Sequence, residues 1–162
     1  MITFVSGDIL LSKANVVAHG VAPNDEHASG LAHSLREQWP AMYKDFRHYC
    51  KTSHPKPGGI WTWAAADGRR IVSLFTQESA YESGSRPGRA SMTHVNHALH
   101  ALHDLVVAEQ IKSLSLPRLA TGVGGLSWEE VRPAIEKWLG TLPIPVSIYT
   151  TFHAGQAALE PA

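Results

Sequence analysis

The sequence has one cysteine, no long apolar run and no excess of charge of either sign. The single thiol, Cys50, excludes an internal disulfide and a zinc site built from several cysteines, and it suits a reducing compartment. No apolar stretch approaches the roughly 20 residues that a membrane-spanning helix needs, and the first residues lack the pattern of a secretory signal. We therefore expect a soluble, cytoplasmic protein that contacts no membrane.

The charges of the chain cancel, with 14 basic and 14 acidic side chains. No overall field therefore draws the protein to nucleic acid or anionic lipid, and any polyanion has to be recognised by a local arrangement of residues. Ten histidines among 162 residues make the net charge rise as the pH falls toward about 6.5. The length and the hydrophobic content of 44% fit a single globular domain.

Short apolar runs alternate along the chain with segments of helical periodicity. Several of the runs are apolar on both faces, as in a sheet that is covered on both sides. The predicted strands are residues 2–5, 16–19, 59–64, 70–75, 113–116 and 146–150. The helical periods are carried by Leu31, Leu35 and Trp39, by Val95, Leu99, Leu102 and Val106, and by Trp128, Val131, Ile135, Trp138 and Leu139. Strands that alternate with helices predict an α/β fold.

Two glycine-bearing turns, at residues 28–32 and 121–126, each follow a predicted strand and open a predicted helix. Backbone N–H groups at a helix N-terminus lack internal partners and lie at the positive end of the helix dipole. Glycine removes the Cβ that would keep an anion away from them. The pair of turns indicates either a cleft around a nucleotide diphosphate or two ordinary connections.

The strand and turn at residues 2–10 (ITFVSGDIL), together with residues 116–128 (LPRLATGVGGLSW), resemble a macro domain. The likeness is greatest to the branch with the terminal ADP-ribose protein glycohydrolase, the antitoxins that strip ADP-ribose from DNA, and the yeast ADP-ribose 1''-phosphatase. It implies a three-layer α/β domain over residues 1–153, with a central mixed, mostly parallel β-sheet flanked by helices. We expect the alanine-rich residues 154–162 to form a flexible tail.

The resemblance also implies an ADP-ribose site in a crevice at the strand ends. Asp8, followed by Ile9, would hold the adenine amino group, and Tyr149 or Phe152 would lie near the adenine face. The first phosphate turn would contain Ser29, Gly30, Leu31 and Ala32, and the second Thr121, Gly122, Val123, Gly124, Gly125 and Leu126. Taken from the residues alone, Asp8 also fits a turn or cap, and Tyr149 also fits core packing.

The sequence departs from the glycohydrolases of this branch at Gln77, which stands where they carry a catalytic lysine. Glutamine has no basic nitrogen, so it forms no covalent adduct with the ribose and is no general base. Residues 74–79, including Thr76, are more similar to the phosphatase, which also lacks the lysine. His19 matches the histidine proposed as catalytic there. An imidazole that titrates near neutrality would act as acid or base, whereas a buried, hydrogen-bonded histidine is the alternative.

Further polar residues carry weaker hypotheses. Asp25, Glu26 and His27 in the first loop, and Glu78 after Gln77, could supply an acid or base, although a solvated loop explains them as well. The histidines at 94, 97, 100 and 103 recur every third residue of a predicted helix, so neighbouring pairs could share a metal but all four could not. Exposed polar positions explain them better, and we predict no metal site and no cofactor.

Together these features predict a monomeric domain that binds ADP-ribose, either free or attached to a protein or nucleic acid. The favoured activity is removal or processing of ADP-ribose modifications without a lysine nucleophile. Two alternatives stay open: an ADP-ribose 1''-phosphate phosphatase, and a reader that binds ADP-ribose and catalyses nothing.

Overall fold

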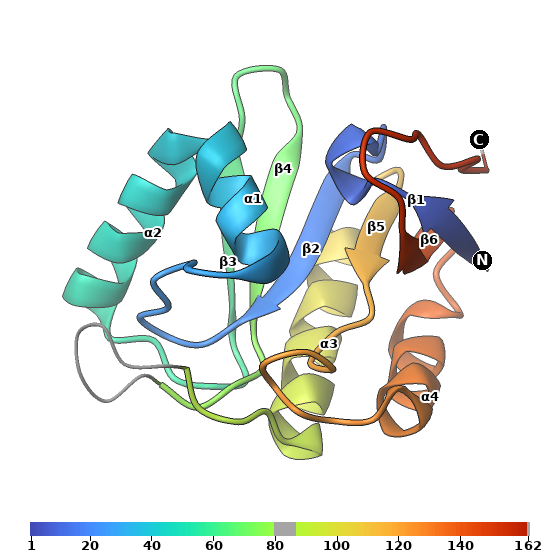
Figure 1. Cartoon of the computed structure of the whole chain (residues 1–162). Helices are drawn as coiled ribbons and strands as arrows, with labels where there is room; N and C mark the ends of the chain where they lie inside the picture. Colours follow the sequence, from blue (N-terminus) through green and yellow to red (C-terminus); the bar gives the residue numbers. More distant parts are fainter. Residues whose placement is uncertain (80–86, 162) are drawn as a thin grey trace.

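A six-stranded mixed sheet forms the centre of the computed structural model, which describes residues 1–79 and 87–161 (Figure 1). The strand order is β1-β6-β5-β2-β4-β3, and every neighbouring pair is parallel except β3 with β4. The strands are β1 (Ile2–Gly7), β2 (Val16–Val21), β3 (Ile60–Ala64), β4 (Arg70–Phe75), β5 (Leu114–Pro117) and β6 (Val146–Phe152). The mixed, mostly parallel sheet predicted from the sequence is therefore confirmed.

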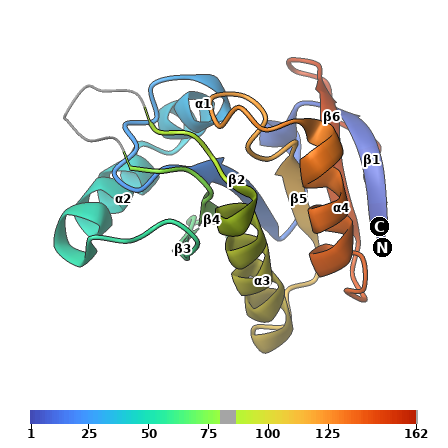
Figure 2. The same cartoon turned by 90° about the horizontal axis from the view of Figure 1, so that it is seen from below.

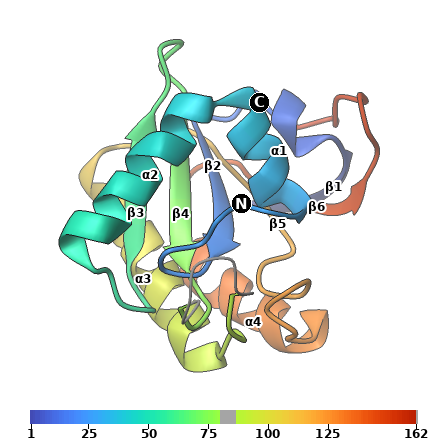
Figure 3. The same ribbon diagram turned by 60° about the vertical axis from the view of Figure 1, so that its left-hand side comes forward.

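Helices cover both faces of this sheet, as the views in Figures 2 and 3 show. The helices α1 (Gly30–Gln38) and α2 (Pro40–Ser53) lie on one face, and α3 (Met92–Ala108) and α4 (Trp128–Leu139) on the other. A short 3-10 turn, Ile9–Leu11, follows β1. Within the described ranges, every helix is too short or too polar to cross a bilayer.

The sheet separates two apolar layers because side chains alternate across each strand. Val16 and Ala18 of β2 pack with α3 and α4, whereas Val17 and Val21 pack with α1 and α2. Phe46 of α2 is fully buried in the second layer. His19 lies on the same side of the strand as Val17 and Val21, so its ring points under α1 and α2.

The carboxyl ends of parallel strands meet at one edge of a sheet, and the connections that leave them meet there too. In Figure 1 the β2–α1 loop and the β5–α4 loop lie at the same edge. These loops contain the two glycine turns singled out in the sequence. The topology thus brings residues about 90 positions apart in the chain to one place.

The segment after β6, for which the sequence predicts a flexible tail, lies against the end of β1 in the structure. Asp8 N donates to Gln156 O at 2.7 Å, and a Cβ built at Gly7 would lie 2.8 Å from Ala158 N. Glu160 accepts hydrogen bonds from the Ser12, Ser115 and Tyr149 hydroxyls and from Lys13 N. The alanine-rich composition does not predict these contacts, because one carboxylate, that of Glu160, makes most of the polar contacts of this segment.

Candidate functional site

A mostly apolar cavity of about 400 Å³ lies where β1, β5 and β6 end. Its size is within the range of small-molecule sites. Six of the predicted ligand-binding residues line it, namely Asp8, Ile9, Gly30, Leu31, Tyr149 and Phe152. Leu10, Ser34 and Pro117 complete much of the wall. The structure thus brings the predicted adenine residues together with Gly30 and Leu31 of the first predicted phosphate turn, whereas Ser29 and Ala32 are not among the lining residues.

Asp8 supplies the carboxylate of this cavity and is held on both oxygens. Its Oδ1 accepts from Leu10 N and its Oδ2 from Gly155 N, each at 3.0 Å. A carboxylate has about four lone-pair positions, so each oxygen still accepts a further donor. Asp8 therefore does serve as a cap, as the residues alone allowed, and it remains able to receive an exocyclic amine.

Tyr149 and Phe152 stand on the same strand but differ in their surroundings. Tyr149 is buried, and its hydroxyl donates to Glu160 at 2.8 Å. Burial, together with the neighbouring Glu160 carboxylate, raises the pKa of the Tyr149 phenol. Phe152 lines the same cavity with 69% of its surface exposed. Phe152 is consequently the ring with a free face, while Tyr149 forms the fixed wall.

The first phosphate turn forms the N-terminus of α1. Gly30 is the first helical residue, and Ser29 before it makes no side-chain cap. The amides of Gly30, Leu31 and Ala32 therefore have no acceptor among the described residues. Gly30 has φ +62°, a left-handed conformation that favours glycine, and a Cβ there would meet only open space. This helix end offers three amides to an anion.

The second phosphate turn is a compact loop between β5 and α4. Gly125 N donates to Gly122 O, and Leu126 N donates to Ala120 O, so the loop is closed by its own backbone. The amides of Gly122, Val123 and Gly124 have no partner in the part of the chain that the structure describes. Thr121 turns its hydroxyl back to Arg118 O.

Different glycines of this loop serve different purposes. A Cβ at Gly124 would lie 2.7 Å from Ala120 O and 2.9 Å from Ala90 Cβ, so the fold itself requires glycine there. A Cβ at Gly122 would meet nothing within 4 Å. The space over Gly122 is therefore open to a ligand.

Gln77, expected from the resemblance to stand at the position of the family lysine, is 5% exposed and makes a structural contact. Its Nε2 donates to Gly88 O at 3.0 Å, and its backbone forms an isolated bridge with Ala90. The neighbouring Thr76 is fully buried, with its Oγ1 unpaired within the described residues. In this conformation the Gln77 side-chain amide is hydrogen-bonded to Gly88 in the segment that precedes α3.

His19 is buried in the layer under α2 rather than exposed in the crevice. It is 2% exposed, and its Nε2 lies 3.4 Å from the Ser73 hydroxyl on the neighbouring strand. Burial, aided by the nearby His27 ring, lowers the pKa of His19 to about 3. Of the two alternatives for His19, the structure favours the buried histidine over an imidazole that titrates near neutrality.

His27 lies in the same layer, 5.8 Å from His19 between ring centroids. It is fully buried against Phe46 and Tyr43, and burial lowers its pKa to about 4. Asp25 is also buried, and its carboxylate accepts from Ala22 N and His27 N. The side chains of Asp25 and His27 are thus buried on the inner side of the first loop, and the explanation as solvated loop residues is wrong for both.

The remaining polar candidates are engaged elsewhere. Glu78 forms an ion pair with His94 at 2.7 Å. His100 stacks on Trp138, and His103 contacts Asp104. No group of three or more metal-ligating side chains occurs among the described residues.

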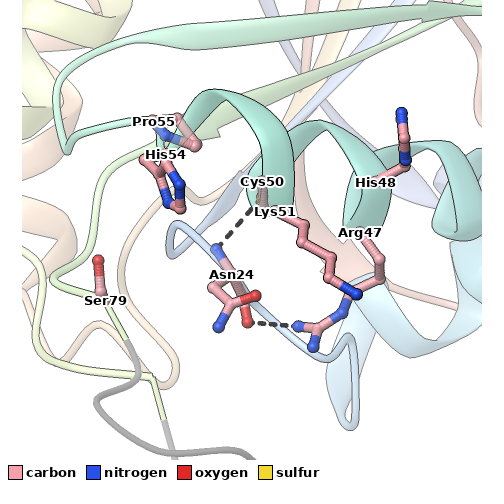
Figure 4. Close-up of a pocket in the computed structure, with 8 residues that line it drawn as sticks. All are labelled: Asn24, Arg47, His48, Cys50, Lys51, His54, Pro55 and Ser79. Atoms are coloured by element: carbon pink, nitrogen blue, oxygen red, sulfur yellow. Dashed lines mark hydrogen bonds between the residues drawn. The ribbon is translucent and has the colours of Figure 1, made fainter.

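Two features of this edge were not predicted from the sequence. A Cβ at Gly125 would lie 3.3 Å from Arg89 Nη2, so a guanidinium stands beside the second phosphate loop. A second cavity, of about 640 Å³, lies between the β2–α1 loop and the last turns of α2 (Figure 4).

The helix α2 was also not predicted from the sequence, although Met42, Phe46 and Cys50 recur every fourth residue as a buried helical stripe.

Comparison with proteins of known sequence adds relatives to this geometry, although no family model matches the chain. The DNA ADP-ribosyl transferase-DNA ADP-ribosyl glycohydrolase fusion protein of Thermosipho africanus is 27% identical over 160 residues, which cover 91% of this chain and 41% of that protein. The chain therefore spans less than half of that relative. The ADP-ribose glycohydrolase OARD1 of Homo sapiens is 24% identical over 155 residues, covering 92% of this chain and 91% of that protein.

Solved structures agree with the sequence relatives. The macrodomain of Thermus aquaticus DarG matches with a TM-score of 0.81 at 24% identity, covering 93% of this chain and 98% of that one. Thermosipho africanus DarTG in complex with ADP-ribose matches with a TM-score of 0.80 at 23% identity, covering 96% of this chain and 42% of that one. The chain thus has the macrodomain fold, and the relatives that it matches in sequence are named ADP-ribosyl glycohydrolases.

Proposed function

We propose that this chain binds ADP-ribose along the carboxyl edge of its sheet. The observation that carries the proposal is the pair of unpartnered amide rows, one at the N-terminus of α1 and one at Gly122–Gly124. Both belong to connections at one edge of the sheet, where they suit the two phosphates of a diphosphate. The Arg89 guanidinium beside Gly125 adds positive charge to that position.

The order of the strands suggests how the adenosine and ribose ends of ADP-ribose are oriented along the edge of the sheet. The adenosine end fits the 400 Å³ cavity at β1, β5 and β6, where Asp8 offers a carboxylate and Phe152 an exposed ring. Stacking on an aromatic face contributes about 1–3 kcal/mol per base in comparable sites. The distal ribose then extends toward the ends of β2 and β4, the strands that precede Asn24 and Gln77.

For the reaction, we propose hydrolysis of the bond that joins ADP-ribose to a macromolecule, with DNA as the first candidate. The names of both relatives support a glycohydrolase, and the name of the Thermosipho africanus relative supports DNA as the carrier. Water adds to the anomeric carbon of the distal ribose, the bond to the carrier atom breaks, and the leaving atom takes a proton. Gln77 has no basic nitrogen and is bonded to Gly88, and burial lowers the pKa of His19 to about 3, which makes its ring a weak proton acceptor, so neither side chain is an effective base at neutral pH. Catalysis then depends on orientation by the amide rows and on water.

The same observation favours a second candidate, a reader that binds ADP-ribose and releases it unchanged. A binding site made from backbone amides works without any catalytic side chain. The reader and the hydrolase share the cavity and the two phosphate turns, and they differ only in turnover.

The first test is calorimetric titration with ADP-ribose and, as a control, with AMP. We expect ADP-ribose to bind more tightly than AMP, and the Gly122→Val variant to lose that preference while keeping its melting temperature. Equal affinity for the two nucleotides in the wild-type protein would refute the two-turn site.

The second test offers three substrates to the protein: ADP-ribosylated DNA, ADP-ribosylated protein and ADP-ribose 1''-phosphate. Release of ADP-ribose from the DNA supports the hydrolase, and phosphate release from the third substrate supports the phosphatase alternative. Tight binding without any product supports the reader. In the cell we propose a cytoplasmic location, on the ground of the single buried thiol.

A further inference from the structure

The second cavity at this edge is the larger of the two and has a cationic wall. It measures about 640 Å³, and Arg47, His48, Lys51 and His54 of α2 and its C-cap line it together with Asn24, Cys50, Pro55 and Ser79. No aspartate or glutamate lies among these lining residues. In a chain with no net charge, this is a local concentration of positive charge of the kind that a polyanion requires.

The cations of this wall keep their charge available. No ion pair joins Arg47 or Lys51 to a carboxylate in the described ranges. Arg47 Nη1 donates to the carbonyl oxygens of Asn24, at 2.7 Å, and Asp25, at 3.4 Å, which fixes the guanidinium without neutralising it. The nearby Asp25 carboxylate is buried and accepts two backbone amides.

The loop side of the cavity is held in place by the same helix. Asn24 N donates to Cys50 Sγ at 3.3 Å, and Figure 4 shows this contact beside the Arg47 contact. Asn24 has φ +62°, which asparagine tolerates better than most residues. The cavity is therefore a formed feature between loop and helix, with its polar atoms already positioned.

The position of the cavity relates it to the proposed ADP-ribose cleft. Asn24 follows β2 and Ser79 follows β4 by a few residues, whereas the adenosine cavity lies at β1, β5 and β6. In the strand order β1-β6-β5-β2-β4-β3, the two cavities lie toward opposite ends of one edge. In the orientation proposed above for ADP-ribose, a group attached to the distal ribose would extend toward the cationic wall.

We propose that this cationic cavity is a phosphate-binding subsite for the nucleic-acid strand that carries the ADP-ribose. The inference rests on the proposed function. Lys51 and Arg47 are four residues apart on α2, so their side chains are neighbours on one helical face and can contact adjoining phosphates. His54 and Pro55 supply flat surface beside them for a sugar or base.

The experiment measures two ligands on the same preparations. Binding of a fluorescein-labelled single-stranded DNA 12-mer without ADP-ribose is followed by anisotropy at several salt concentrations, and binding of free ADP-ribose is followed by calorimetry. The test variant is Lys51→Gln with His54→Asn, because asparagine tolerates the left-handed conformation of His54. The matched control is Lys44→Gln, an exposed lysine of α2 outside the cavity lining.

We expect the double variant to bind DNA about fivefold more weakly, with a smaller salt dependence, while its affinity for ADP-ribose stays within about twofold of wild type. The Lys44→Gln variant should match wild type for both ligands. Equal DNA affinity in the double variant and the control would overturn the subsite, as would displacement of the DNA by a glutamate 12-mer at equal concentration. Failure of the wild-type protein to bind ADP-ribose while binding DNA would instead refute the proposed function.

Discussion

Acidification should weaken this fold because two histidines are buried in their uncharged form. Burial lowers the pKa of His19 to about 3 and that of His27 to about 4, below the ordinary value of about 6.5. Between these values the unfolded chain binds more protons than the folded one. The free energy of unfolding is therefore greatest above about pH 6.5, falls as the pH decreases, and levels off below the folded-state pKa values.

The size of the effect follows from the linkage relation. Each histidine contributes a loss of about 1.4 kcal/mol per pH unit below its unfolded pKa, so its share at about pH 5 is roughly 2 kcal/mol. Both groups lie under α2 and are shielded from solvent, so no large discount for screening applies. A loss of this size is a substantial part of the total stability of a small domain.

The assay is urea unfolding followed by tryptophan fluorescence at about pH 7.5 and about pH 5, on wild type and on His19→Gln. The variant lacks one of the two buried titrating groups, so wild type should lose about 2 kcal/mol more than the variant between the two pH values. His97→Gln, at an exposed position of α3, controls for removal of a histidine as such. An identical pH dependence in wild type and His19→Gln would show that the His19 ring titrates alike in the folded and unfolded states.

Three further substitutions test the site residues. Gly122→Val places a side chain in open space over unpartnered amides. The affinity for ADP-ribose, measured by calorimetry, should fall more than tenfold with little change in melting temperature. Retained affinity would count against the second phosphate turn. Gln77→Ala removes the bond to Gly88 O, and we expect about 1 kcal/mol less stability in urea with ADP-ribose affinity within about twofold; a large loss of affinity would mean that the amide contacts ligand. Tyr149→Phe removes one donor to Glu160, which should cost about 1 kcal/mol and speed proteolysis of the C-terminal segment; unchanged proteolysis would mean that the hydroxyl does not anchor it.

Periodicity in the sequence was enough to predict the layers of the fold. The six strands and the helices α1, α3 and α4 lie where apolar patterns in the sequence predict them. The helix α2 was missed because only Trp39 separates its first residue, Pro40, from the end of α1, so the two helices follow each other without a recognisable loop. Its stripe of Met42, Phe46 and Cys50 was the available signal.

Side-chain environments within the site were less predictable than its location. His19 follows a buried strand pattern, but only the packing of α2 and of the His27 loop shows that its ring is enclosed and uncharged. The contact between Glu160 and Ser12 joins residues 148 positions apart. Such contacts depend on how the layers assemble, and they cannot be predicted from local patterns in the sequence.

Binding and catalysis depend on different parts of this site. That difference determines what a glutamine at position 77, in place of the expected lysine, implies for function. In the proposed complex the diphosphate contacts backbone amides at α1 and at Gly122, and the positions of these amides depend on loop closure and on Gly124 packing against Ala120. A side-chain change at Gln77 leaves those amides where they are. If Gln77 stands where the relatives carry a catalytic lysine, as the resemblance implies, we predict slower chemistry with undiminished ADP-ribose affinity, and measuring turnover and affinity on the same protein checks both parts of this prediction.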